Sequence, residues 1–112
     1  AEKPVMELIA TADPKAGAKV FKKCTACHSA EAGAKHKIGP NLWEIVGRGQ
    51  GKADGFNYSG TLAGLGGTWS IEELNKFLDN PKEYAPGNKM TFRGIPKNAG
   101  RAALLVYLES LK

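Results

Sequence analysis

The sequence is poor in the residues that form metal clusters and disulfide frameworks, with two cysteines, two histidines and two methionines among 112 residues. A four-ligand zinc site would need both cysteines and both histidines together, and their spacing argues against it. Long apolar runs are also missing, since residues 5–12 and 102–108 fall short of the roughly 17–25 residues that cross a bilayer. No basic helix, zinc finger or aromatic RNA-binding motif accompanies the formal net charge of +5, which argues against nucleic acid as a partner.

Glycine, in contrast, is abundant and unevenly placed: ten of the 14 glycines lie between Gly33 and Gly67. That region also lacks any sustained helical or alternating apolar pattern. A loop of this length in a compact domain is either disordered or wrapped around something else. A flat apolar macrocycle would supply the core that this stretch cannot form by itself.

The motif that carries the most chemical information is Cys24-Thr25-Ala26-Cys27-His28. Two thiols three positions apart, followed directly by an imidazole, are typical of covalent haem c attachment. A dithiol redox motif would instead follow a strand, which is missing before Cys24, and a structural disulfide would leave His28 without a role. We therefore expect one haem c, attached through Cys24 and Cys27, with His28 as a ligand of its iron.

The helix signals predict an all-α domain. Asp13 and Pro14 form an N-cap followed by proline in the first turn, so a helix is expected from here toward Cys24. A last helix is expected from near Asn98 to the C-terminus. Its apolar face and the residues that adjoin it are Leu104, Leu108, Leu111, Arg101 and Tyr107.

The middle helix has the sharpest start signal. Ser70 and Glu73 form a capping box, while Trp69 and Leu74 occupy the positions of a hydrophobic staple. The helix is expected to end just before Pro81, because proline disfavours a helical residue ahead of it. No segment shows the alternation of a strand.

The identity of a second axial iron ligand stays open on the residues alone. The soft or nitrogenous candidates are Met6, His36 and Met90, with a deprotonated lysine also available. Met6 lies in an expected tail, and His36, between two lysines, is expected to be a solvated loop residue. Met90 follows a turn set by Pro86 and Gly87 that could present its thioether, although on these grounds core filler is the simpler interpretation.

A series of separate segments adds a further signal. They are residues 24–28, Gly39-Pro40-Asn41-Leu42, Gly47-Arg48, Gly55-Phe56-Asn57-Tyr58, Thr68-Trp69, Asn80-Pro81-Lys82, residues 86–90, Phe92 and Gly94-Ile95. In this order, and along nearly the whole chain, they resemble the class I cytochromes c, the mitochondrial and alphaproteobacterial electron carriers. The resemblance implies a single-domain, all-helical fold with few helices and long glycine-rich loops wrapped around the haem. It also implies that the first and last helices cross, with Gly17 and Phe21 meeting Leu104 and Tyr107.

The same resemblance implies how the haem is held. Met90 would be the distal iron ligand, and the carbonyl of Pro40 would accept the free ring N–H of His28. A buried haem propionate needs hydrogen-bond donors, because an unpaired buried carboxylate is costly. The donors implied by the resemblance are Arg48, Tyr58 and Trp69.

Two residues depart from the family pattern. Phe77 stands where many relatives have a tyrosine whose hydroxyl bonds the methionine sulfur. Leu62 stands where many have an asparagine of the same internal water network. We expect a drier pocket on the Met90 side, with no predicted direction for the reduction potential because the two changes oppose each other.

The function implied by the resemblance is that of a one-electron carrier with no substrate, and not of an enzyme. The alternative is a haem enzyme or gas sensor whose sixth ligand is displaceable. The expected partners are acidic docking faces of membrane-bound redox complexes, because the implied fold gathers lysines around the exposed haem edge. These lysines are Lys23, Lys35, Lys37, Lys82 and Lys89.

The cellular setting follows from the attachment chemistry, which implies maturation outside the cytoplasm. We expect a monomer in the bacterial periplasm or, as the second choice, in the mitochondrial intermembrane space. Residues 1–12 are expected to be a tail or a linker, one reading of which is a connection to an upstream membrane anchor, and residues 13–112 form the domain. The sequence names neither the electron donor nor the acceptor, and it does not separate respiration from photosynthesis.

Overall fold

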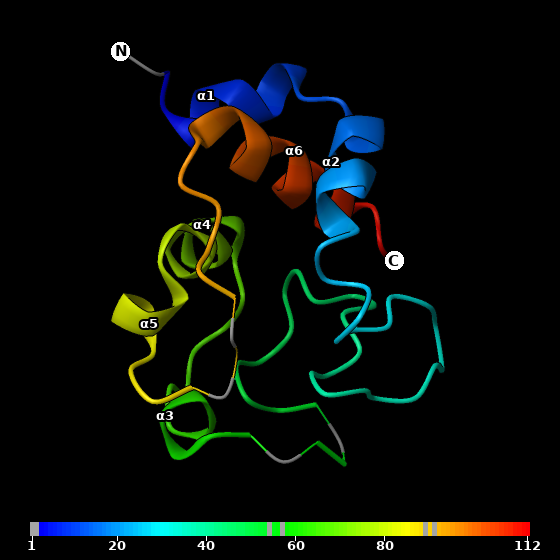
Figure 1. Cartoon of the computed structure of the whole chain (residues 1–112), viewed down its shortest axis with the longest axis vertical. Coiled ribbons are helices and arrows are strands. Elements are labelled where there is room, and N and C mark those ends of the chain that lie inside the picture. The colour runs from blue at the N-terminus through cyan, green and yellow to red at the C-terminus, as the bar shows by residue number, and fades with distance from the viewer. Residues whose placement is uncertain (1–2, 54, 57, 89, 91) are drawn as a thin grey trace.

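The computed structural model describes residues 3–53, 55–56, 58–88, 90 and 92–112 (Figure 1). Its elements are α1 (Val5–Leu8), a 3-10 helix (Ile9–Thr11), α2 (Pro14–Phe21), α3 (Gly60–Ala63), α4 (Ile71–Asp79), α5 (Pro81–Tyr84) and α6 (Asn98–Glu109). Within these ranges the one β-type pairing is an isolated antiparallel bridge between Gly49 and Thr68. The prediction of an all-α fold with a long loop region between α2 and α3 is confirmed. None of the helices in the described part has the length and hydropathy needed to cross a membrane.

α2 begins at the predicted residue, with the predicted cap. The Asp13 side chain accepts a hydrogen bond from the Lys15 backbone N–H at 2.9 Å, and Pro14 occupies the first turn. The helix ends at Phe21, so the turn that follows carries the two cysteines.

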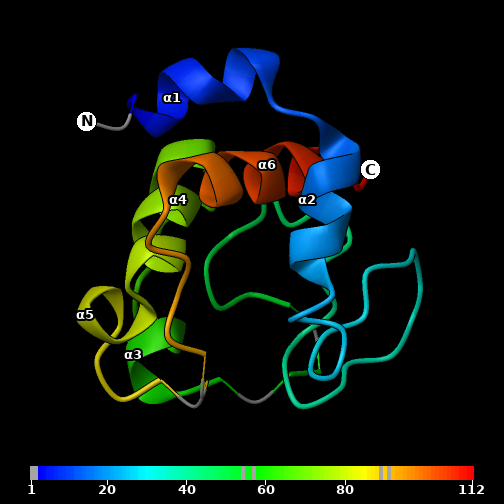
Figure 2. The same cartoon turned by 45° about the horizontal axis from the view of Figure 1, so that its top comes forward.

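α2 and α6 cross in close contact (Figures 1 and 2). The backbones meet at Gly17, where a Cβ atom would overlap the Ala103 carbonyl and the Tyr107 Cβ atom. The Phe21 ring packs on the Tyr107 ring with their centroids 5.2 Å apart. The expected crossing is present: Tyr107 meets both Gly17 and Phe21, and Ala103 adds a backbone contact at Gly17.

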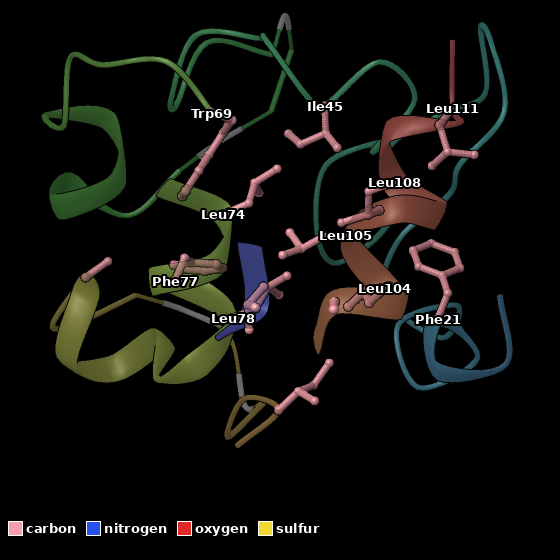
Figure 3. Close-up of a cluster of buried hydrophobic side chains, with 14 residues drawn as sticks. Phe21, Ile45, Trp69, Leu74, Phe77, Leu78, Leu104, Leu105, Leu108 and Leu111 are labelled. Carbon is pink, nitrogen blue, oxygen red and sulfur yellow. The ribbon is translucent and has the colours of Figure 1, made fainter. Parts of the chain in front are cut away.

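Leu104 belongs to the apolar core cluster, to which α2, α4 and α6 contribute and which Figure 3 shows in close-up. Leu104 and Leu105 are 1% and 0% exposed and lie on the side of α6 that faces α4. The core side chains of α4 are Leu74, Phe77 and Leu78. The two helices thus pack against each other and fix the positions of both ends of the segment that connects them.

The start of α4 matches the predicted capping box only in part. The Ser70 hydroxyl accepts the Glu73 backbone N–H at 3.1 Å, as predicted. The reciprocal bond is replaced, because the Ser70 N–H donates to the Thr68 carbonyl at 2.9 Å. The Glu73 carboxylate instead accepts the Tyr84 hydroxyl at 2.6 Å, so it links α4 to α5. α4 ends at Asp79, shortly before Pro81, as predicted.

The N-terminal segment differs from the expected tail. Residues 5–11 form α1 and the 3-10 helix, and both pack on α6 at one end of the molecule (Figure 2). Val5 is 4% exposed and belongs to the core cluster, with Leu8 and Ile9 packed against it. The spacing of these three residues places them on one helical face, which α6 covers.

Candidate functional site

The candidate site begins at the turn that follows α2. The Cys24 N–H donates to the Phe21 carbonyl at 2.7 Å, and the Cys27 and His28 N–H groups donate to the Cys24 carbonyl at 3.0 and 2.8 Å. These are the bonds of a tight helical turn, on which residues three and four apart share a face. The two half-buried thiols, both free, and the imidazole are thereby presented together.

The Cys24 thiol is chemically quiet in this environment. Burial, with the neighbouring Cys27, raises the pKa of Cys24 to about 11, although Lys23 acts in the opposite direction. The thiolate is the reactive form in thiol–disulfide exchange, so a thiol that stays protonated at neutral pH is a poor attacking group. This property argues against the dithiol redox alternative.

His28 is held in one orientation by its neighbours. Its Nδ1 atom lies 2.8 Å from the Pro40 carbonyl oxygen, as the resemblance implied. A carbonyl only accepts, so Nδ1 carries the proton and Nε2 carries the lone pair that a metal needs. Gly39 packs flat against the ring, where a Cβ atom would overlap the imidazole.

The electrostatic surroundings keep this imidazole neutral. Burial lowers the pKa of His28 below its usual value, and the Arg48 and Lys37 charges act in the same direction. The hydrogen bond to Pro40 opposes them by raising the pKa. A neutral imidazole is the form that ligates a metal.

The loop that presents Pro40 is organised by two residues whose role the sequence did not reveal. Asn41 is 8% exposed, and its amide donates to the carbonyls of Glu31 and Ala34 at 2.8 and 3.0 Å. The expectation that His36 is a solvated residue is wrong, because it is half-buried and its Nδ1 accepts the Asn41 backbone N–H at 2.9 Å. In the sequence, Gly39-Pro40-Asn41 indicates a turn, but this pattern does not specify the hydrogen-bond partners of Asn41 or His36.

Arg48 and Trp69, far apart in sequence, are brought together by the bridged segments. The Trp69 N–H donates to the Arg48 carbonyl at 2.8 Å, and the Gly47 N–H donates to the Trp69 carbonyl at 2.8 Å. Trp69 is 7% exposed, and no described residue accepts a hydrogen bond from its indole N–H. The Tyr58 hydroxyl accepts the Ala53 N–H at 3.0 Å, which leaves its own proton available to donate.

Arg48 carries a buried hydrogen-bond donor, Nε, that has no acceptor among the described residues. One of its two terminal nitrogens, Nη1, donates to the Trp43 carbonyl at 3.4 Å. Burial lowers the pKa of Arg48, and only Tyr58 opposes the shift. A buried guanidinium with an unpaired donor is expected to face an anion.

Met90 and Met6 occupy very different environments. Met90 is half-buried and packs against the core cluster, and its backbone N–H donates to the Asn88 side-chain oxygen at 2.9 Å. Met6 is 50% exposed on α1. Of the two thioethers, that of Met90 is therefore the one held by surrounding structure.

The two departures from the family pattern lie near this loop region. Phe77 is 7% exposed, and its ring packs on Trp69 and Tyr84 with centroids 5.2 and 5.7 Å away. Leu62 is half-buried against the core cluster. Neither side chain offers a hydrogen-bond donor, so the drier pocket stays a prediction with these residues as its basis.

Two of the expected docking lysines are fixed to the site. Lys37 Nζ donates to the Thr25 carbonyl at 2.9 Å, and Lys82 Nζ donates to the Met90 carbonyl at 3.0 Å. Lys23 and Lys35 are exposed. Lys89 lies outside the described residues.

Taken together, these features fit haem c. The turn at residues 24–28 presents two thiols and an imidazole with a free Nε2. Gly39, which has no side chain, leaves room for this imidazole. The unpaired Arg48 Nε, beside Trp69, fits a carboxylate such as a haem propionate. Among the described residues, this turn included, no three His, Cys, Asp or Glu side chains gather in a way that could hold a metal ion by themselves.

Comparison with known proteins gives a consistent result. The family described as cytochrome c matches residues 14–112. A cytochrome c homolog of Bradyrhizobium diazoefficiens is 48% identical over 113 residues, which cover 99% of this chain and 61% of that protein. Cytochrome c-550 of Ancylobacter novellus is 48% identical over 100 residues, covering 87% of this chain and 94% of that protein. Cytochrome c of Ginkgo biloba is 46% identical over 98 residues, with 87% of both chains covered.

Proposed function

The chain belongs to the cytochrome c family, and on this premise we propose that it carries single electrons between redox partners. Like other members of the family, it binds a covalently attached haem c, through Cys24 and Cys27. When bound, the haem supplies an iron centre that exchanges one electron between its ferric and ferrous forms. The chain spans 61% of the Bradyrhizobium protein, so the activity of the whole protein is part of this proposal.

The observation that carries the proposal is the orientation of His28. The hydrogen bond from Nδ1 to the Pro40 carbonyl, at 2.8 Å, directs Nε2 to the iron and strengthens it as a ligand. Met90 would supply the second iron ligand, because it is the half-buried one of the two thioethers and its backbone N–H is held by the Asn88 side chain. Two ligands that stay bound in both oxidation states limit the rearrangement that accompanies each electron transfer.

The propionates are held by donors on the bridged segments. Arg48 offers a buried Nε that has no partner among the described residues, and Trp69, whose backbone pairs with that of Arg48, offers an indole N–H. Tyr58 donates its hydroxyl proton while accepting the Ala53 N–H. These side chains pair the buried carboxylate and so reduce the cost of burying it.

Docking to partners takes place at a basic surface. Lys37 and Lys82 are anchored to the backbone of the segments that carry His28 and Met90, so their charges would lie near a haem held by these residues. The exposed Lys23 and Lys35 extend this surface, and acidic faces of membrane-bound redox complexes complement it. We place the protein in the bacterial periplasm, since haem c is attached outside the cytoplasm.

Replacing Met90 tests the ligand set. A thioether on low-spin ferric iron gives a weak near-infrared charge-transfer band, so Met90→Ala should abolish that band and open the iron to added ligands. The measurement is the near-infrared spectrum of the ferric holoprotein. Met6→Ala is the matched control and should leave the spectrum unchanged. Survival of the band in Met90→Ala would assign the ligand to Met6.

A further inference from the structure

Asn88 is a buried polar side chain inside the loop that carries Met90. It is 6% exposed, although its side chain is a primary amide. Its Nδ2 donates to the carbonyls of Pro81 at 2.9 Å and Ala85 at 2.8 Å. Its Oδ1 accepts the Met90 backbone N–H at 2.9 Å. Both N–H groups and the carbonyl of this amide therefore have partners.

These hydrogen bonds connect Met90 to a rigid part of the fold. Pro81 is the first residue of α5 and is less than 2% exposed, and Ala85, just after the helix, is 0% exposed. Neither residue can move without disturbing the core. The Asn88 side chain thus holds the Met90 backbone at a fixed position relative to the buried residues Pro81 and Ala85.

Two further side-chain bonds to the described part of this loop lie at the surface. Lys82 Nζ donates to the Met90 carbonyl at 3.0 Å, and the Thr61 hydroxyl of α3 donates to the Pro86 carbonyl at 2.7 Å. Both are exposed, so water can replace either donor at little cost. Water cannot as readily replace the buried Asn88 amide, because the loss leaves buried carbonyls and an N–H without partners.

We propose that Asn88 is the positioning residue for Met90, and that it sets how readily the thioether leaves the iron. The inference rests on the proposed role of Met90 as axial ligand. In this role Asn88 contacts neither the iron nor the haem. It acts by keeping the Met90 backbone in the place from which the side chain reaches the iron, and so it closes the sixth position to other ligands.

The test uses ferric holoprotein and imidazole as the competing ligand, with binding followed by stopped-flow absorbance. Asn88→Ala should speed imidazole binding by at least about tenfold, corresponding to about 1.4 kcal/mol. It should also weaken the near-infrared thioether band. Asn88→Thr retains a smaller donor and acceptor, and its rate should fall between those of Asn88→Ala and the unaltered protein. If Asn88→Ala fails to fold, Asn88→Thr carries the test by itself, with a rate above that of the unaltered protein.

A matched control separates positioning from general loss of stability. The Asn75 side chain is half-buried on α4 and accepts Arg101 Nε at 2.6 Å, away from the Met90 loop. Asn75→Ala should destabilise the fold without changing the imidazole rate. Equal acceleration by Asn75→Ala and Asn88→Ala, or no acceleration in any Asn88 variant, would overturn the inference.

The outcome also distinguishes this inference from the proposed function. If the unaltered protein binds imidazole as fast as Met90→Ala does, Met90 is not the ligand and both proposals fail. If Met90→Ala binds fast while the Asn88 variants match the unaltered protein, only the role of Asn88 is rejected.

Discussion

At the scale of single residues, Trp69 has both a structural and a proposed haem-binding role. Its ring packs on Phe77 and Tyr84, with centroids 5.2 and 5.8 Å away, and its backbone pairs with Arg48. Its indole N–H has no acceptor among the described residues. These roles involve different atoms, so one substitution can separate them.

Trp69→Phe retains most of the apolar packing and removes the N–H. If that group pairs a propionate, the free energy of unfolding should fall by about 1–3 kcal/mol, the cost of a lost buried donor. The reduction potential should change as well, because one donor to a carboxylate near the iron is gone. Denaturant unfolding and potentiometry of the holoprotein measure both. Unchanged stability together with an unchanged potential would rule out the propionate contact.

Single residues also show where sequence reasoning stops. The role of the Pro40 carbonyl could be predicted from the resemblance, and the hydrogen bond to His28 is present. The roles of Asn41 and Asn88 could not be predicted, because their side chains bond to carbonyls that only the folded loops bring within reach, and no local pattern encodes the conformation of those loops. From the sequence, an asparagine in a turn indicates only that the residue favours the turn. The folded loop is needed to show that its amide is buried.

At the scale of elements, helix starts were predictable and helix docking was less so. The caps at Asp13 and Ser70 act over two or three residues, so the sequence specifies them directly. α1 was missed because a four-residue helix has no stability of its own. Its helical conformation depends on packing against α6, a contact that joins the two ends of the chain.

Two neighbouring residues of α1 test whether this packing stabilises the fold. Val5 is 4% exposed and Met6 is 50% exposed. Val5→Ala removes two buried methyl groups and should lower the free energy of unfolding by about 1–2 kcal/mol. Met6→Ala, on the same helix, should change it by less than about 0.5 kcal/mol. Equal effects in denaturant unfolding would mean that α1 does not dock on α6 in solution.

At the scale of the whole molecule, the distribution of positive charge governs encounters. The chain carries a formal net charge of +5, and a ferric haem with two ionised propionates adds about −1, so the holoprotein stays basic. An acidic partner is attracted over distances of about 8 Å at physiological ionic strength. A partner is attracted to the haem edge in particular only if the residues around that edge carry a positive charge; a positive net charge of the whole protein is not sufficient.

Two charge reversals of equal size distinguish these possibilities. Lys23 lies beside Cys24, whereas Lys3 is on the N-terminal segment, where its carbonyl accepts the Asn98 side chain at 3.0 Å. Lys23→Glu should slow association with an acidic redox partner more than Lys3→Glu, while neither changes the haem spectrum. The difference should shrink as salt is added. Equal slowing in stopped-flow electron transfer would show that net charge alone steers the encounter.

We propose that this chain fills both axial positions of the haem iron, which would distinguish an electron carrier from a gas sensor or haem enzyme with an open position. Carbon monoxide binds ferrous haem only where a position is open or easily vacated, so the reduced holoprotein at neutral pH is the direct test. We expect the visible spectrum of the unaltered protein to stay unchanged after carbon monoxide is added, whereas Met90→Ala should bind carbon monoxide at once. Rapid binding by the unaltered protein would contradict the account and favour the alternative of a displaceable sixth ligand.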